Sequence, residues 1–598
     1  MSGIFGLLCK EPIKGELVYE CLRRLFYRGV DGCGVAFEDD SSSIVIRKKA
    51  LSIDKARDFF RLDNVWTKRA IGHVLHVIRG MPVDVNTQPH QDCSLNISVV
   101  SDGLIKNYEE LKLLLQEKNH VFKTTTDVEV LPHMLEEELE AGTDFLEALR
   151  RIALKAYGMY SAIFMIKGES SLGFIARGLP IVMGISSKCF FLSSDVPSLY
   201  GVAEEAIIIE EDVVGAVTQE GFSVFSLDAW KELKSFVRKT LKRTYEYPEK
   251  GGYPHFMIKE IRETPEALRR TTLSLMEKYL RLASMIIVNS RGVVITGSGS
   301  SYHAGLLGQH YLSELAQVSA SVVNASEFPY YAVGGISTGT VVIAISQSGE
   351  TSDVIKSIRL AKLRGAVIIG ITNTLGSRLV LHSNVYLPIG AGPEFVIPAT
   401  KTFSSTVASL LILSAHVGAY KGLLSETDVK RVYNEIEVLS HDIEKSLDEI
   451  EVTAERIAKE VKDSPLIYVV GSGALYPIAL EGVLKLKEAS LTHAVGLQLG
   501  ELRHGHIAVL KESVPVILLE PLEREVRELY ENILEVLRIR GTKVIEVGKS
   551  GDLLVPSSGK LTAPIAYAVA LQMFAYKLGV IKGVSIDSPP GLAKAVTT

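Results

Sequence analysis

Cysteine is scarce in this chain, and neither sign of charge dominates. The 598 residues contain five cysteines, and 65 basic against 70 acidic side chains give a net charge of −5. The cysteines show no metal-ligand spacing and are odd in number, so we expect free thiols in a reducing cytoplasm. A balanced charge without a basic stripe argues against nucleic acid as a partner. The five are Cys9, Cys21, Cys33, Cys93 and Cys189.

Long hydrophobic runs are missing as well. Residues 1–6 lack the charged start and apolar core of a secretion signal. The most apolar later run, residues 407–413, is too short to span a bilayer and predicts a buried helix. Apolar residues nevertheless make up 47% of the chain, which is enough for several cores. We therefore expect a multidomain cytoplasmic enzyme with no membrane partner.

Two turns rich in glycine and hydroxyl side chains are the most informative feature present. Residues 297–302 follow the apolar run 292–296, and residues 346–351 follow the apolar run 341–345. Each turn precedes a helix-like stretch, so the pattern predicts strand, tight turn and helix, twice. Such turns point backbone N–H groups and a positive helix end at a ligand above the strand ends. Ordinary helix caps would explain one such turn, but two on successive strands favour a phosphate site.

The second half of the chain repeats this pattern in a reduced form. Residues 471–476 follow the apolar run 465–470, but Ala474 and Leu475 replace the two serines of the first copy. The later apolar run 514–519 leads into a turn without a hydroxyl cluster. We infer two α/β units of the same topology, of which the first kept its phosphate turns. Duplicated units can bind a ligand between them.

Composition changes along the chain divide it into domains. Helical periodicity in the front part is clearest over residues 108–118 and 128–139, and a charged helix over 426–462 connects the two later units. The predicted segments are a front domain (1–240), a linker rich in proline, glycine and charge (241–254), a first α/β unit (255–430) and a second α/β unit with an irregular tail (440–598).

Several short motifs of this chain are similar to those of the glutamine–fructose-6-phosphate amidotransferases, also called glucosamine-6-phosphate synthases. The resemblance implies an α/β multidomain protein: an N-terminal Ntn-hydrolase-like α+β sandwich that acts as a glutaminase, followed by two doubly wound sugar-isomerase (SIS) units. It also implies a homodimer and no cofactor or metal. The motifs are residues 325–328, 346–351, 400–403, 479–482, 485–488, 500–505 and 592–594, with front landmarks at Arg28-Gly29, Asp31, Pro82, Asn86, Pro89-His90, Thr126-Asp127 and Glu129.

The resemblance assigns roles at a sugar site. It implies that Glu488 moves a proton between C1 and C2, that His504 opens the sugar ring, and that Lys594 forms a Schiff base with the open-chain ketose. The other readings are a surface ion pair for Glu488, which shares a helical face with Glu481 and Lys485, and solvated side chains for the histidine and the tail lysine. The implied phosphate ligands are Ser300, Ser301, Ser346, Gln347, Ser348 and Thr351.

The implied glutaminase site has lost its chemistry. Ser2 stands where the family has a nucleophilic cysteine after the initiator methionine, and a hydroxyl is harder to ionise than a thiol. Leu75 replaces the arginine that holds the glutamine carboxylate. Asp102, followed by Gly103, replaces the oxyanion-hole asparagine, a donor worth ~10²–10³ in rate. Asp127, which in the family binds the glutamine amine, is retained. We expect a front domain that is folded but catalytically silent.

Three functions remain open on the sequence. The first is conversion of fructose 6-phosphate and ammonia to glucosamine 6-phosphate, with ammonia free or supplied by a separate glutaminase in place of glutamine. The second uses the same site as a phosphosugar isomerase or a glucosamine-6-phosphate deaminase. The third is a non-enzymatic phosphosugar-binding regulator. Glu488, His504 and Lys594 together argue against the third, because a regulator has no use for all three.

Overall fold

The computed structural model describes residues 2–77, 79–209, 212–241, 250–587, 589, 591–592 and 594. Contacts divide the chain into two compact units, residues 1–249 with 596–598, and residues 250–595. Most of the predicted linker, residues 242–249, lies outside the described residues. So do several residues of the predicted irregular tail, including Ala593 and Val596.

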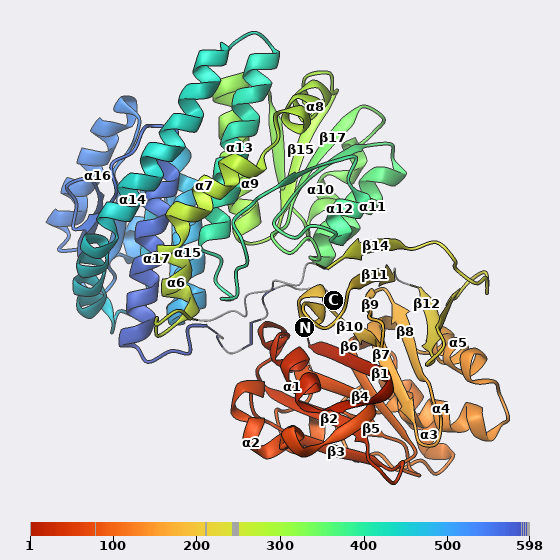
Figure 1. The fold of residues 1–598 in the computed structure, drawn as a ribbon. Coiled ribbons are helices and arrows are strands. Elements are labelled where there is room, and N and C mark those ends of the chain that lie inside the picture. Colours follow the sequence, from red (N-terminus) through yellow and green to blue (C-terminus); the bar gives the residue numbers. More distant parts are fainter. Residues whose placement is uncertain are drawn as a thin grey trace. The chain divides into compact units, whose positions relative to one another are not determined.

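The first unit contains two antiparallel sheets (Figure 1). In order across the sheet, the eight strands of one are β14 (Val237–Thr240), β11 (Glu205–Ile209), β9 (Ile181–Ile185), β10 (Cys189–Ser193), β1 (Gly3–Lys14), β4 (Trp66–Leu75), β2 (Gly32–Glu38) and β3 (Ile44–Lys49). The six strands of the other are β13 (Phe222–Ser226), β12 (Val213–Val217), β8 (Leu172–Arg177), β7 (Gly158–Ile166), β6 (Ile97–Ile105) and β5 (His90–Gln91).

The two sheets pack face to face through an apolar core that includes Ile4, Ile71 and Ile163. A second core joins the eight-stranded sheet to α1 (Glu16–Arg23), and a third joins the six-stranded sheet to α3 (Tyr108–Glu117), α4 (Val130–Glu140) and α5 (Phe145–Lys155). Helices therefore cover both outer sides of the sandwich, as the fold prediction required. The helices predicted over 108–118 and 128–139 are confirmed as α3 and α4.

The expectation that all five cysteines are free thiols is wrong. Cys9 and Cys189 form a disulfide, while Cys21, Cys33 and Cys93 are free. β1 and β10 are antiparallel neighbours, and Cys9 and Cys189 are direct register partners across that pair. The two cysteines are 180 residues apart in the chain, so only strand pairing brings them together.

The second unit contains two five-stranded parallel sheets with one topology. Numbered along the chain within each half, the strands of both sheets lie in the order 2-1-3-4-5, which confirms the internal repeat. The first sheet is β16 (Ala320–Asn324), β15 (Gly292–Gly297), β17 (Thr340–Ile345), β18 (Val367–Thr372) and β19 (Val385–Pro388); the second is β21 (Ala494–Gln498), β20 (Ile467–Gly471), β22 (Val516–Leu519), β23 (Val544–Gly548) and β24 (Leu553–Leu554).

Helices lie on both faces of the first parallel sheet (Figure 1). One face carries α9 (Ser300–Ala316) with α13 (Lys401–Tyr420) packed on it, and the other carries α10 (Phe328–Tyr331), α11 (Ser352–Leu363) and α12 (Arg378–His382). The charged helix predicted over 426–462 is confirmed as α14. The remaining helices are α6 (Phe256–Arg262), α7 (Thr264–Ser274), α8 (Glu277–Val288), α14 (Glu426–Val461), α15 (Tyr476–Ser490), α16 (Arg527–Ile539) and α17 (Ala563–Ile581).

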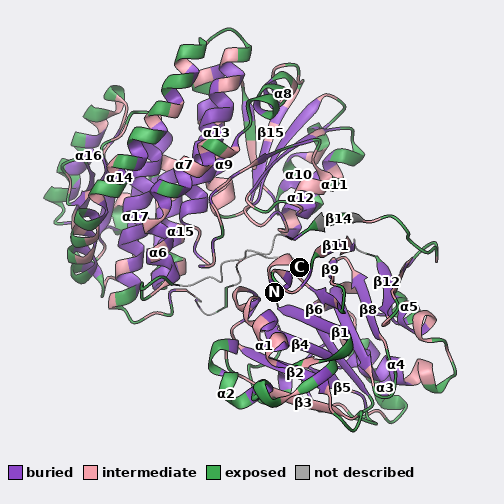
Figure 2. Ribbon diagram, viewed as in Figure 1, coloured by how far each residue is buried: buried purple, intermediate pink, exposed green. Residues whose placement is uncertain are grey.

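Helices α13 and α17 are long and apolar enough to cross a membrane. The apolar windows of the two helices are 89% and 83% buried inside the protein, and Figure 2 shows both helices mostly buried. They therefore qualify as core helices of the second unit, as expected for residues 407–413. Residues 407–413 form the buried middle of α13, as predicted, and the whole helix is longer than that apolar run because it extends over Lys401–Tyr420.

Candidate active site

The two hydroxyl-rich turns lie side by side at a topological switch point of the first parallel sheet. β15 pairs directly with β17, and the turns leave the carboxyl ends of these two strands. α9 begins at Ser300 after Gly299, whose φ of +55° suits glycine. Gly349 has φ of +68°, and a Cβ there would lie 2.0 Å from Ser377 Oγ. The tight turns therefore aim two helix N-termini, those of α9 and α11, at one region.

Hydrogen bonds order the second turn. Ser346 Oγ lies 2.9 Å from Thr351 Oγ1 and accepts from the N–H of Gly349 at 3.0 Å. Ser348 Oγ accepts from a backbone N–H at 3.2 Å. The carbonyl oxygen of Gln347 accepts from the N–H of the residue after β18 at 3.1 Å. The structure thus brings these four predicted ligands together in one rigid turn.

In the first turn, Ser300 contacts a buried charged cluster on α15. Ser300 Oγ donates to Glu481 Oε1 at 2.8 Å and accepts from Lys485 Nζ at 3.3 Å. Lys485 Nζ also lies 2.5 Å from Glu488 Oε2, and His303 Nδ1 lies 2.8 Å from Glu481 Oε2. Ser301, the next residue of the turn, is partly exposed. Lys485 therefore links the first hydroxyl-rich turn to Glu488.

The reading of Glu488 as a surface ion pair is wrong. Glu481, Lys485 and Glu488 do share one face of α15, but their side chains are only 1%, 0% and 18% exposed. Burial raises the pKa of Glu488, and Lys485 only partly offsets this. Burial would also raise the pKa of Glu481, but Lys485 and the bonds from His303 and Ser300 outweigh it and lower that pKa. The pKa values of these two neighbouring glutamates therefore shift in opposite directions, which is typical of carboxylates with separate roles.

Lys594 lies in a second buried charged group. Its Nζ donates to Glu394 Oε2 at 2.7 Å and to the carbonyl oxygen of Val396 at 2.5 Å. Burial opposes ionisation of Glu394, but Lys594 and hydrogen bonds from Thr402 and other groups lower its pKa to about 2. Lys594 is also close enough to lower the pKa of Glu488 in part. The tail lysine is thus folded into the unit rather than solvated.

Glu260 lies beside this group with the opposite behaviour. Burial, and then the charge of Glu394, raise the pKa of Glu260 to about 8. Glu260 Oε1 accepts from the N–H of Phe395 at 2.6 Å. Glu260 thus holds the chain next to Glu394, the partner of Lys594. Because Glu260 is protonated there, only Glu394 of the two buried carboxyl groups carries a negative charge.

His504 is exposed and lies between two short 3₁₀ turns, Gly500–Arg503 and His506–Val509. Within the described part of the chain, no hydrogen bond or ion pair joins its side chain to Glu488, Lys594 or a phosphate turn. The structure therefore brings together Glu488, Lys594 and the phosphate turns, but it does not bring His504 into contact with them.

In the first unit, Asp102 is held by two donors. The main-chain N–H of Ser2 donates to Asp102 Oδ1 at 2.9 Å, and Arg28 Nη2 donates to Asp102 Oδ2 at 2.9 Å. Arg28 also donates to the carbonyl oxygen of Ser2 at 3.0 Å and to Asp195 at 3.2 Å. Asp102 is thus the acceptor in a buried ion pair. As an oxyanion ligand Asp102 is unsuitable because an ionised carboxylate has no hydrogen to donate. Its own negative charge is balanced by Arg28.

Leu75 and Asp127 flank this group. Leu75 is buried at the end of β4, and its carbonyl oxygen accepts from the N–H of Asp31 at 2.9 Å. Burial raises the pKa of Asp127, which the N–H of Ile105 and the charge of Arg79 partly offset. The Arg79 guanidinium stacks 4.2 Å from the ring centre of Tyr108. Gly103, with φ of +107°, has no room for a side chain because a Cβ would lie 2.2 Å from Met159 O.

Sequence reasoning missed several residues that hold these sites. Glu394 and Glu260 carry no motif, and only the fold places them beside Lys594. Lys485 was named merely as a possible ion partner, although its spacing from Glu481 and Glu488 was visible. Arg28 was recognised as a landmark, but its contact with Asp102 joins segments 74 residues apart.

Comparisons with known proteins cover both units. The sequence matches the SIS domain family over residues 286–415 and 460–581, and the glutamine amidotransferase domain family over residues 75–200. It is 35% identical to glutamine–fructose-6-phosphate aminotransferase [isomerizing] of Thermococcus kodakarensis and 34% identical to that of Pyrococcus horikoshii, over 100% of both chains in each case. The solved C-terminal domain of glucosamine-fructose-6-phosphate aminotransferase from Francisella tularensis matches with 28% identity and a TM-score of 0.53, covering 57% of this chain and 100% of that one.

Proposed function

Because this chain belongs to the family of isomerizing glutamine–fructose-6-phosphate aminotransferases, we propose that it forms glucosamine 6-phosphate from fructose 6-phosphate and ammonia rather than glutamine. The protein is an enzyme with a glutamine amidotransferase domain and two SIS domains. Membership of the family indicates the sugar substrate and the transfer of an amino group. The residues of the glutaminase site in the first unit indicate ammonia as the nitrogen source.

The ammonia proposal rests on the two hydrogen bonds that Asp102 accepts, one from the main-chain N–H of Ser2 and one from Arg28. Removal of Met1 would turn the Ser2 N–H into an amine 2.9 Å from the Asp102 carboxylate. A carboxylate at that distance favours the protonated amine, and a protonated amine cannot take the proton of the Ser2 hydroxyl. Since Asp102 also donates nothing to an oxyanion, one residue opposes both activation of the nucleophile and stabilisation of the intermediate.

At the sugar site, the turns 297–302 and 346–351 bind the phosphate through hydroxyl groups, backbone N–H groups and two helix ends. Ser300, Ser301, Ser346, Gln347, Ser348 and Thr351 supply these contacts. The region needs no lysine in the turns, because N–H and O–H donors to a phosphate form charge-assisted hydrogen bonds. Lys485, which touches Ser300 at 3.3 Å, adds a buried positive charge behind the first turn.

Lys594 and Glu488 carry the covalent and proton-transfer steps. The Lys594 amine attacks C2 of the open-chain ketose and loses water to form a Schiff base; ammonia then displaces the lysine at C2. Glu488 accepts the proton from C1 and returns it to C2, for which its raised pKa is suited. Glu394 pairs with the Lys594 ammonium, so substrate binding must separate that pair before the amine attacks. His504, on the exposed loop between the 3₁₀ turns 500–503 and 506–509, acts on ring opening.

The test is purified protein with fructose 6-phosphate and either an ammonium salt or glutamine, scored for glucosamine 6-phosphate and for glutamate. We expect amino sugar with ammonium and no glutamate above background with glutamine. Formation of only an aldose phosphate with ammonium would identify an isomerase instead. Binding of the sugar without turnover would identify a regulator.

A further inference from the structure

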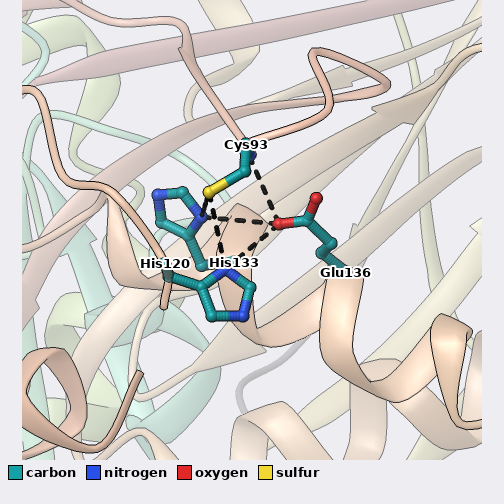
Figure 3. A group of neighbouring side chains, drawn as sticks. All are labelled: Cys93, His120, His133 and Glu136. Atoms are coloured by element: carbon teal, nitrogen blue, oxygen red, sulfur yellow. Dashed lines mark hydrogen bonds and ion pairs between the residues drawn. The ribbon is translucent and has the colours of Figure 1, made fainter. Parts of the chain in front are cut away.

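A compact group of four side chains lies in the first unit, apart from the residues assigned to glutamine chemistry. Cys93 lies in the loop between β5 and β6, and His120 lies in the loop after α3. His133 and Glu136 lie three residues apart on α4 and share one face of that helix. Figure 3 shows the four side chains pointing toward one another from these separate elements.

Four of the distances among these side chains are those of a tetrahedral metal site. Cys93 Sγ lies 3.6 Å from His120 Nδ1 and 3.5 Å from His133 Nδ1. Glu136 Oε2 lies 3.2 Å and 3.6 Å from the same two nitrogens. A tetrahedral zinc ion with its usual bond lengths to sulfur, nitrogen and oxygen separates its ligands by about 3.3–3.6 Å. One nitrogen, oxygen or sulfur atom per residue faces a common centre, within 4.8 Å of the other three.

The chemistry of the ligand set favours zinc. A thiolate with two imidazoles is a poor set for magnesium or calcium, which prefer oxygen. One thiolate, one carboxylate and two neutral histidines carry two negative charges, which balance a divalent cation in a mostly buried place. The side chains of His120, His133 and Glu136 are 9%, 1% and 8% exposed, whereas Cys93 is exposed and leaves a route for loading.

Neighbouring groups orient the four ligands. The N–H of Ser94 donates to Glu136 Oε1 at 3.2 Å and the N–H of Cys93 donates to Glu136 Oε2 at 3.2 Å, so the β5–β6 loop fixes both carboxylate oxygens, and Oε2 keeps a lone pair for the centre. His120 Nε2 lies 3.3 Å from Glu137 Oε1, a carboxylate–histidine contact that fixes the ring with Nδ1 inward. The N–H of Val121 lies 3.4 Å from Cys93 Sγ and can donate to a thiolate there. Each proposed ligand except the buried His133 thus has a second contact that sets its direction.

We propose that Cys93, His120, His133 and Glu136 bind one structural zinc ion. Four protein ligands fill the tetrahedral positions, so the ion has no open site for catalysis. It ties the β5–β6 loop and the α3–α4 connection to α4, and that connection carries Asp127. The first unit keeps its fold around a silent glutamine site, and the zinc stabilises that fold.

The test is the metal content of full-length protein expressed without a histidine tag, incubated with zinc chloride and freed of loose metal by gel filtration. We expect about one zinc per chain. Cys93→Ser and His133→Ala should lose it, while Cys21→Ala and His441→Ala, which remove a thiol and an imidazole outside the cluster, should keep it. X-ray absorption of the unaltered protein should show one sulfur and three nitrogen or oxygen ligands, which tests the site even where a variant fails to fold.

Three results would overturn the proposal. One is a zinc content near zero after loading, which would leave the cluster as a hydrogen-bonded group. Another is bound zinc whose absorption spectrum contains no sulfur ligand, since Cys93 supplies the only thiolate of the group. The third is unchanged zinc content in folded Cys93→Ser and His133→Ala proteins, which would place the metal elsewhere.

Discussion

Arg28 Nη2 donates to Asp102 Oδ2 at 2.9 Å, with both side chains almost fully buried. The pair joins the segment around Arg28 to β6. The main-chain N–H of Ser2 donates to the other carboxylate oxygen of Asp102. Asp102 therefore holds Ser2 in place, which is a structural use for a residue that we propose opposes glutamine hydrolysis.

Replacing Asp102 with asparagine should destabilise the first unit. The change leaves the buried Arg28 with Asp195 as its remaining acidic partner, and breaking a buried pair typically costs about 3–5 kcal/mol. Thermal or denaturant unfolding of the variant measures this loss. Asp54→Asn, which breaks an exposed pair with Arg23, is the control and should change stability by less than about 1 kcal/mol. Equal stability of both variants would mean that the Arg28–Asp102 pair does not hold Ser2 in place.

The phosphate turn should depend on its hydroxyl groups. Ser346→Ala with Thr351→Val removes two donors that face the switch point, each worth about 1.5–3 kcal/mol to a charged acceptor. We expect fructose 6-phosphate to bind about 10²- to 10⁴-fold more weakly in calorimetry. Ser472→Ala, in the corresponding turn of the second half, should leave affinity unchanged. The reverse pattern would move the phosphate to the second half.

Borohydride added with fructose 6-phosphate should trap the sugar on Lys594, because reduction makes a Schiff base permanent. Peptide mass mapping identifies the modified lysine. Lys594→Arg keeps the positive charge beside Glu394 but cannot form the adduct, and it should abolish trapping. The two buried lysines Lys401 and Lys485 serve as internal controls. An adduct on either of them, or trapping that survives Lys594→Arg, would remove Lys594 from the covalent step.

Glu260 should make stability fall as pH rises from about 5 to 8. Its pKa of about 8 in the folded protein lies above the ordinary value of 4.5, so the folded state binds more protons than the unfolded state in that window. Stability is full below the unfolded pKa and declines by up to about 1.4 kcal/mol per pH unit until the folded pKa is passed.

Glu260→Gln keeps the acceptor for the N–H of Phe395 but cannot ionise. Its midpoint of thermal unfolding should therefore change less between pH 5 and pH 8 than that of the unaltered protein. The pH dependence of unfolding of Glu488→Gln is a useful comparison, because this change removes another carboxyl group whose pKa is raised by burial. Parallel pH profiles for the unaltered and Glu260→Gln proteins would show that Glu260 is ionised in the fold.

Local pattern was sufficient to predict the strands and turns of the second unit and its internal repeat, because strand, glycine turn and helix follow one another along the chain. The α3 and α4 helices were also visible as periodic segments. What could not be predicted was long-range pairing. The Cys9–Cys189 disulfide depends on the register of β1 and β10, and the cluster of Cys93 with His120, His133 and Glu136 depends on three segments meeting. Only the His133–Glu136 spacing carried a local signal.

The site was predictable in its residue types but not in its electrostatics. The spacing of Glu481, Lys485 and Glu488 left a surface ion pair open as the other reading, and the packing of α15 against its neighbours, among them α9 and α17, buries the three side chains. Burial then separates the pKa values of two glutamates that sequence treats alike. Lys594 was predicted as a nucleophile from the resemblance alone, and its contact with Glu394 could not be predicted because the two residues lie 200 positions apart in the chain.

The source of the transferred nitrogen tests the account most directly. The protein is supplied with fructose 6-phosphate, glutamine labelled with ¹⁵N at the amide, and unlabelled ammonium, and the nitrogen of the amino sugar is read by mass spectrometry. Ser2→Ala is the matched control and should behave like the unaltered protein. We expect unlabelled glucosamine 6-phosphate from both proteins. Labelled product from the unaltered protein that disappears in Ser2→Ala would contradict it, because Ser2 would then be a working nucleophile.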